Sequence, residues 1–155
     1  MGRSYDQLAA ELAQARATLK ARRDQRVPPG KDTKILTSWN GLMLAALAEA
    51  AWVVDRPDHL ERAEAAAGFL LDNLRQPDGR LFHVFKDGRA RFNGYLEDYA
   101  YLIDGLTRLG QVTGTTRWLR EAVDLSRLMI DEFADEVKDG VGGFAFTGVR
   151  HETLV

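Results

Sequence analysis

Apolar residues recur every three or four positions along most of the chain, which is the spacing of a helix that buries one face. The first such segment has a stripe from Leu8 to Leu19, and Ser4 can cap its start. The second is apolar on every side around its centre, so we expect protein to surround it, and Thr37 or Ser38 can cap it. The pattern predicts five helices, at residues 5–23, 39–54, 58–74, 97–112 and 115–133.

Two short apolar runs without helical spacing interrupt this pattern. Leu81–Phe85 and Ala90–Phe92 lie on either side of Asp87-Gly88, a dipeptide typical of tight hairpin turns. Proline and glycine within residues 76–79 indicate a turn just before the first run. We therefore predict one short β-hairpin in an otherwise helical chain.

The helical pattern repeats with a shift of 59 positions and no gap through two helices. The repeated unit is an inner helix, an outer helix, a glycine and a short strand, so Gly79–Phe82 aligns with Gly143–Phe146 after a small insertion. The apolar pairs include Met43 with Leu102, Leu44 with Ile103, Leu47 with Leu106, Leu60 with Leu119, and Leu70 with Met129. Units of this kind bury their inner helices by stacking on neighbours, and about three are needed for stability.

Two units and a leading helix predict an all-α chain of about two and a half helical hairpins, with the β-hairpin added. An open solenoid and a closed α/α toroid both suit such units, and strands on one side favour the toroid. We assign residues 1–30 to the leading helix, 37–92 to the first helix pair with the β-hairpin, and 96–148 to the second pair with its strand. The chain ends directly after the predicted start of a strand, so we expect it to be a fragment of the toroid.

Composition narrows the classes of function. A net charge of -2 shows no basic excess, so nucleic acid is not an expected partner. The chain has no cysteine and no histidine pair at metal-ligand spacing, so we expect no metal and no other cofactor in it. The longest apolar run, at 41–48, is too short to cross a membrane, and no signal peptide is evident, which favours a cytoplasmic protein without a membrane partner.

Several stretches together resemble one known family. They are Leu19–Arg23, Lys31–Met43 (KDTKILTSWNGLM), Leu96–Leu106 (LEDYAYLIDGL), Trp118-Leu119 and Gly142–Phe144, in that order. With them the chain resembles the thioredoxin-domain-containing YyaL-type family, whose bacterial members are related to spermatogenesis-associated proteins of animals. The resemblance implies a thioredoxin-like domain followed by a six-hairpin, glycosidase-like α/α toroid, similar to those of N-acylglucosamine 2-epimerases and unsaturated glucuronyl hydrolases. The chain would hold the first part of that toroid.

Three titratable side chains are candidates for catalysis. Glu97 and Asp98 are adjacent acids at the start of an inner helix, and in the related toroids this end faces the mouth of the cavity. Such acids can share acid and base work, although acids in a first turn also serve as caps. His83 on the predicted β-hairpin can act as a general base, and His151 lies on the same side. No partner for either histidine is evident from the sequence.

Aromatic and amide side chains near these acids are candidates for substrate binding. Trp39 and Asn40 lie 59 positions before Asp98 and Tyr99, so both repeats would contribute to one opening, together with Tyr95. Aromatic rings beside amides and acids suit a sugar ligand. Core packing and helix capping explain the same residues without a ligand.

Two functions remain open from the sequence. One is a wall of a carbohydrate-active or carbohydrate-binding toroid, acting as a sugar epimerase or a glycoside hydrolase-like protein. The other is a non-catalytic helical-repeat scaffold that partners a thioredoxin-like domain or another protein, so catalysis itself is left open. In either case an incomplete toroid leaves an apolar flank uncovered, and we expect the isolated chain to self-associate.

Overall fold

The computed structural model describes residues 2–135 and 142–150. The chain divides into two units, residues 1–32 and residues 33–155. The first unit contains helix α1 (Tyr5–Asp24), and none of the residues of α1 is buried. Ser4 Oγ accepts the backbone N–H of Gln7 at 3.2 Å, and Gln7 Oε1 accepts that of Ser4 at 3.0 Å. The predicted cap of the first helix is therefore confirmed as a reciprocal capping box.

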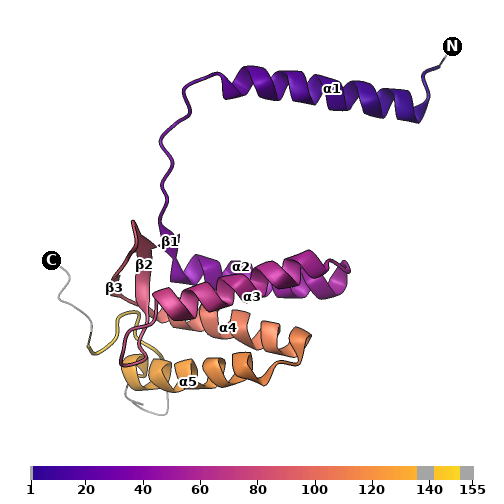
Figure 1. The fold of residues 1–155 in the computed structure, drawn as a ribbon. Coiled ribbons are helices and arrows are strands. Elements are labelled where there is room, and N and C mark those ends of the chain that lie inside the picture. The colour runs from indigo at the N-terminus through magenta and orange to yellow at the C-terminus, as the bar shows by residue number, and fades with distance from the viewer. Residues whose placement is uncertain (1, 136–141, 151–155) are drawn as a thin grey trace. The chain divides into compact units, whose positions relative to one another are not determined.

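The second unit combines two helical hairpins with a small antiparallel sheet (Figure 1). Its helices are α2 (Thr37–Val53), α3 (Pro57–Asn73), α4 (Leu96–Thr113) and α5 (Thr116–Phe133). Its strands are β1 (Ile35–Leu36), β2 (Phe82–Lys86) and β3 (Arg89–Asn93), in the order β1-β2-β3. Each predicted helix is confirmed with ends within two residues. The strands lie at the end of the hairpins where α2 and α4 begin.

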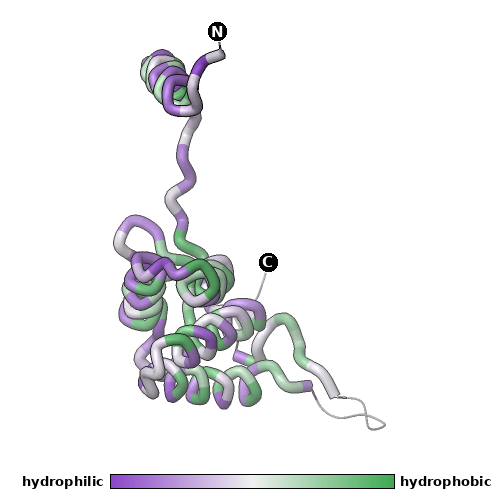
Figure 2. The backbone as a smooth tube through the Cα atoms, turned by 90° about the vertical axis from the view of Figure 1, so that its right-hand side faces the viewer, coloured by the Kyte–Doolittle hydropathy of each residue, from purple (hydrophilic) through white to green (hydrophobic). Residues whose placement is uncertain are grey.

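Leucine side chains between α2, α3, α4 and α5 form the hydrophobic core. Leu44, Leu102, Leu106 and Leu125 are each 0% exposed. Figure 2 shows the same alternation along the chain, with apolar and polar residues following one another around each helix. Burial of one apolar face per helix is therefore what holds the second unit together.

Helix α2 departs from the prediction that protein surrounds it. Its buried side includes Ser38, Gly41 and Leu44, whereas within the second unit its opposite side is open. Trp39 is 69% exposed and Met43 is 58% exposed. The prediction is wrong for this unit because α3 and α4 cover only part of the helix, although its sequence is apolar all round.

The repeat predicted from the sequence is confirmed by equivalent backbone contacts. A shift of 59 positions carries the first residues of α2 and α3 onto those of α4 and α5. The bridge Arg75↔Leu81 has its counterpart in Ala134↔Phe144. Leu81 therefore corresponds to Phe144. The alignment of Gly79–Phe82 with Gly143–Phe146 places the partner of Leu81 one residue later, so the insertion in the second copy is one residue shorter than predicted and is four residues long.

Strand β1 was not predicted, and it changes the start of α2. Ile35 and Leu36 pair with Phe85 and Val84 of β2. Thr37 Oγ1 donates to the carbonyl oxygen of Phe82 at 2.6 Å, so its side chain bonds to the sheet and does not cap the helix. The N-cap of α2 is Leu36, without a side-chain cap, and the prediction that Thr37 or Ser38 caps the helix is wrong.

The predicted β-hairpin is confirmed, with a two-residue turn between Lys86 and Arg89. Both turn residues have left-handed backbone conformations, with φ of 51° at Asp87 and 74° at Gly88. This is the turn that Asp-Gly favours, since its twist matches that of the strands.

Replacing Gly88 by valine is expected to lower the free energy of unfolding by about 1 kcal/mol or more, because a β-branched residue resists a positive φ. A Cβ at this position meets no atom within 4 Å, so the loss would come from the backbone alone. Urea denaturation followed by circular dichroism measures it. The Asp87→Asn variant is the control, since asparagine tolerates the same conformation, and equal losses in both variants would contradict this explanation.

Candidate functional site

Asp98 is the centre of a buried hydrogen-bond cluster where α2, α4 and β2 meet. Its side chain is 0% exposed. Oδ1 accepts the backbone N–H of Ser38 at 2.8 Å, and Oδ2 accepts that of Tyr95 at 2.9 Å. The first bond joins the start of α2 to the start of α4, and the second closes the first turn of α4, where the helix dipole favours an acid. Asp98 therefore fixes the relative position of the two inner helices.

The third partner of Asp98 is His83 on β2. The distance from His83 Nδ1 to Asp98 Oδ2 is 2.8 Å, and the imidazole keeps 23% of its side-chain surface exposed. An ionised carboxylate can only accept, so Nδ1 carries the proton, and in the neutral imidazole Nε2 holds the lone pair. A buried aspartate that orients a histidine in this way is a feature of general-base catalysis. The structure thus supplies the partner that the sequence did not reveal.

Aromatic rings extend from this pair towards the second copy of the repeat. The rings of His83 and Tyr95 meet edge to face, with centroids 5.0 Å apart and planes at 84°. Tyr95 in turn stacks on Phe146 at 5.0 Å, and the backbone N–H of Leu96 donates to the carbonyl oxygen of Phe146 at 3.1 Å. The imidazole therefore lies beside a packed aromatic surface on one side.

The β-hairpin is irregular directly opposite His83. The register pairs Phe82 with Asn93 and Val84 with Arg91, but it omits the position between them, where Phe92 has φ of 59°. A positive φ is unusual for a bulky residue, and such strain is concentrated at functional sites. This irregularity coincides with the residue best placed for chemistry.

Tyr99, a predicted substrate-binding residue, lies in the core. It is 2% exposed, its hydroxyl accepts the backbone N–H of Leu81 at 2.9 Å, and its ring meets Phe133 edge to face. Burial raises the pKa of this hydroxyl above its usual value, while the bond from Leu81 opposes the shift. These contacts explain Tyr99 as a core residue, and no ligand is needed to explain it.

The remaining predicted residues lie at the starts of α2 and α4 without joining the cluster. Glu97 is half-buried, and its carboxylate has no hydrogen bond or ion pair in the described part of the chain. Asn40 Nδ2 donates to the carbonyl oxygen of Leu36 at 2.8 Å, which steadies the start of α2. Trp39 follows Ser38 directly and points its indole away from the core. The structure thus brings Asp98, His83 and Tyr95 together. Glu97 precedes Asp98 in the chain and has no polar partner among the described residues.

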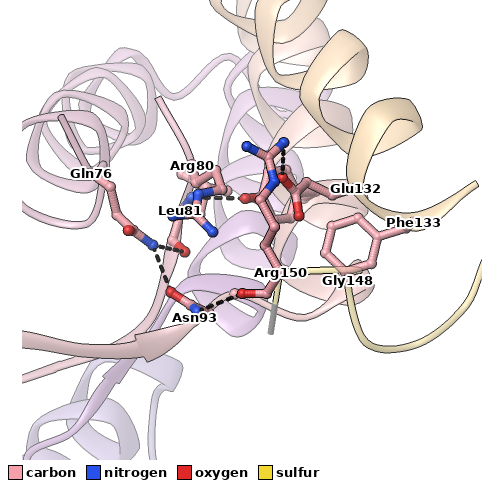
Figure 3. Close-up of a pocket in the computed structure, with 10 residues that line it drawn as sticks. Gln76, Arg80, Leu81, Asn93, Glu132, Phe133, Gly148 and Arg150 are labelled. Atoms are coloured by element: carbon pink, nitrogen blue, oxygen red, sulfur yellow. Dashed lines mark hydrogen bonds and ion pairs between the residues drawn. The ribbon is translucent and has the colours of Figure 1, made fainter. Parts of the chain in front are cut away.

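A second polar cluster, which the sequence did not suggest, lies between the hairpin and α5 (Figure 3). Glu132 is 3% exposed and forms an ion pair with Arg150. The carbonyl oxygen of Arg150 accepts from Asn93 Nδ2 at 3.3 Å, and Gln76 Nε2 donates to Asn93 Oδ1 at 3.0 Å. The cavity among these residues, about 10 Å³, has room for one water molecule and not for a sugar. This cluster therefore connects segments and is not a ligand site.

Within residues 2–135 and 142–150, no group of three or more histidine, cysteine or acidic side chains could hold a metal ion. Among the helices described, none has the length and apolarity required to cross a bilayer. His151 lies outside the described residues.

Comparison with known proteins yields relatives of much greater length. No protein-family model matches the chain. An uncharacterized protein of Caenorhabditis elegans is 29% identical over 132 residues, which cover 81% of this chain and 18% of that protein. Spermatogenesis-associated protein 20 of Homo sapiens is 31% identical over 112 residues, covering 66% of this chain and 14% of that protein, and its Rattus norvegicus counterpart is also 31% identical, covering 67% and 14%. The chain is therefore similar to a segment of spermatogenesis-associated protein 20 and spans less than a fifth of these relatives.

Proposed function

We propose that the chain forms one wall of the cavity of a carbohydrate-active α/α toroid and that His83 transfers protons there. The observation that carries this proposal is the 2.8 Å hydrogen bond between His83 Nδ1 and the buried carboxylate of Asp98. In the proposed mechanism Nε2 of His83 accepts a proton from the substrate. Asp98 acts as a positioning residue, since it fixes the imidazole and does not itself reach solvent.

Three groups at the starts of α2 and α4 support a sugar as the substrate class. Glu97 has no polar partner among the described residues, so its carboxylate can accept hydrogen bonds from hydroxyl groups or act as a second acid or base. Tyr95 provides a half-buried aromatic ring beside the imidazole, and Asn40 provides an amide at the start of α2. Aromatic, amide and acid groups at the same end of the helices as the histidine suit a polar ring whose carbon or glycosidic oxygen exchanges a proton. The longer protein would be a sugar epimerase or a glycoside hydrolase-like enzyme with a thioredoxin-like domain.

A second candidate function is a non-catalytic scaffold that holds a thioredoxin-like domain or another protein. The open apolar side of α2, with Trp39, Leu42 and Met43, favours this alternative. In a scaffold the bond from Asp98 to His83 would serve only to join the sheet to the helices. The two functions differ in whether a small ligand interacts with the imidazole.

The test is a titration of the chain with a panel of mono- and disaccharides, followed by NMR of the histidine imidazole and by calorimetry. We expect one class of sugar to shift the His83 signals with a dissociation constant of about 1 mM or tighter. The Glu97→Gln variant should weaken this binding about tenfold by losing one charged hydrogen bond.

The matched control is Glu64→Gln, on the exposed side of α3, which should bind as the unchanged chain does. His59 provides an internal reference signal, since it lies at the start of α3 outside the cluster. If no sugar of the panel shifts the His83 signals, the carbohydrate proposal is refuted and the scaffold function is favoured.

A further inference from the structure

The contact between α2 and α4 shows how one repeat packs on the next. Gly105 of α4 lies so close to α2 that an added Cβ would be 2.7 Å from the carbonyl oxygen of Gly41. A Cβ on Gly41 would in turn be 2.6 Å from the backbone nitrogen of Leu102. The α4 side of this contact comprises Asp98, Tyr101, Leu102 and Gly105, and we name it the leading face of the second repeat.

The same face of the first repeat is open within the second unit. A shift of 59 positions converts the leading face of α4 into Trp39, Leu42, Met43 and Ala46 of α2. Leu42 is 48% exposed and Met43 is 58% exposed. These four residues are the leading face of the first repeat, and their exposure follows from the lack of a preceding repeat in this unit.

The surface that would complement this face is also present, on the other side of α4. In α2 the residues that receive the second repeat include Gly41 and Leu44, and their equivalents in α4 are Ala100 and Ile103. We name Glu97, Ala100, Ile103 and Thr107 the trailing face of the second repeat. Ala100 and Ala46 occupy the positions that match Gly41 and Gly105, and their Cβ atoms require the two helices to lie farther apart than α2 and α4 do within the chain.

Charge at the edge of the contact is complementary as well. Arg108 Nη1 of α4 forms an ion pair with Glu49 Oε2 of α2 at 3.2 Å, and these two residues are equivalents in the repeat. A second copy placed like an additional repeat would again bring an acid against a base, with Glu49 of one copy facing Arg108 of its neighbour. Apolar area and charge therefore agree on the same pair of faces.

We propose that the leading face of one copy of the chain binds the trailing face of a second copy, through the pair of faces that joins the two repeats within the chain and with a wider spacing between the helices. Such a contact is head-to-tail, and it builds open chains or rings of copies rather than a symmetric pair. Trp39, at the position of Asp98, packs in this contact, so its exposure in a single copy does not require a sugar. The proposal does not require the chemistry at His83, although the trailing face includes Glu97, which the proposed function assigns to sugar binding.

The test uses two variants of the whole chain, each of which blocks one face. Met43→Glu places a charge on the leading face, and Ala100→Arg places a large charged side chain on the trailing face. Sedimentation velocity should show that the unchanged chain grows with concentration beyond a dimer, whereas each variant alone remains a monomer. An equal mixture of the two variants should form a dimer and nothing larger, since each supplies the intact face that the other lacks. Circular dichroism confirms that both variants are folded.

Other results would overturn the proposal. A monomeric unchanged chain at millimolar concentration would exclude the contact. Dimers of Ala100→Arg alone would indicate a symmetric contact between leading faces instead. Loss of association in Leu12→Glu, a change on α1, would assign the contact to the first unit.

Discussion

Replacing Asp98 by alanine is expected to lower the free energy of unfolding by about 3 kcal/mol, because it leaves buried donors without acceptors. The backbone N–H groups of Ser38 and Tyr95 and the imidazole of His83 all depend on this one carboxylate. Each unsatisfied buried donor costs about 1–3 kcal/mol, and relaxation that admits water recovers part of this. The Asp98→Asn variant should lose less, since one oxygen remains to accept from Ser38.

Urea denaturation monitored by circular dichroism measures the effect, and Asp104→Ala is the matched control on the same helix. Asp104 is 49% exposed and pairs with Arg108 at the surface, so its loss should cost less than about 1 kcal/mol. A similar loss in both variants would mean that Asp98 does not join the helices as described. If the Asp98→Ala chain is as stable as the unchanged chain but its His83 NMR signals change, Asp98 positions the imidazole without contributing to stability.

Replacing Gly105 by alanine is expected to cost about 2 kcal/mol, although alanine is the better helix former by about 1 kcal/mol. The added Cβ would lie 2.7 Å from the carbonyl oxygen of Gly41 and 3.0 Å from Leu44 Cδ2. Because the closest atom belongs to the backbone, α2 and α4 would have to move apart. The loss should appear as a lower midpoint of thermal unfolding.

Gly68→Ala is the control for this change, and the opposite sign is expected. Gly68 lies within α3, and a Cβ there meets no atom within 4 Å. Alanine should therefore raise the free energy of unfolding by about 0.5–1 kcal/mol. If Gly105→Ala also stabilised the protein, the close approach of α2 and α4 would be wrong.

The sequence predicted the parts of the fold that depend on local pattern. Helix ends and the Asp87-Gly88 turn follow from apolar spacing and turn chemistry, and each is seen in the structure. Strand β1 was missed because a two-residue strand has no periodicity to detect, and its pairing depends on β2 nearly 50 residues away. The open side of α2 was missed for a related reason, since the apolar character of a residue does not reveal which neighbour, if any, covers it.

The candidate site was predictable only as a list of residue types. The sequence places Asp98 in a first helical turn, where an acid can be a cap or a cavity residue. Its bond to Tyr95 is local and fits the cap, whereas its bonds to Ser38 and His83 arise from tertiary packing. Tyr99 shows the converse, since an aromatic residue near a candidate site can equally well be core.

The span of the Asp98 cluster has a consequence for the order of folding. Ser38 and Asp98 are 60 positions apart, and His83 and Asp98 are 15 apart. During synthesis the chain can form α2, α3 and the β-hairpin before Asp98 has been added. It cannot orient the imidazole until α4 docks on α2. Contacts between residues so far apart in sequence form after local ones, because the entropy of closing the loop must be lost first. The histidine is therefore set in place only as the two repeats join, so a partly folded chain would carry its side chain without its orientation.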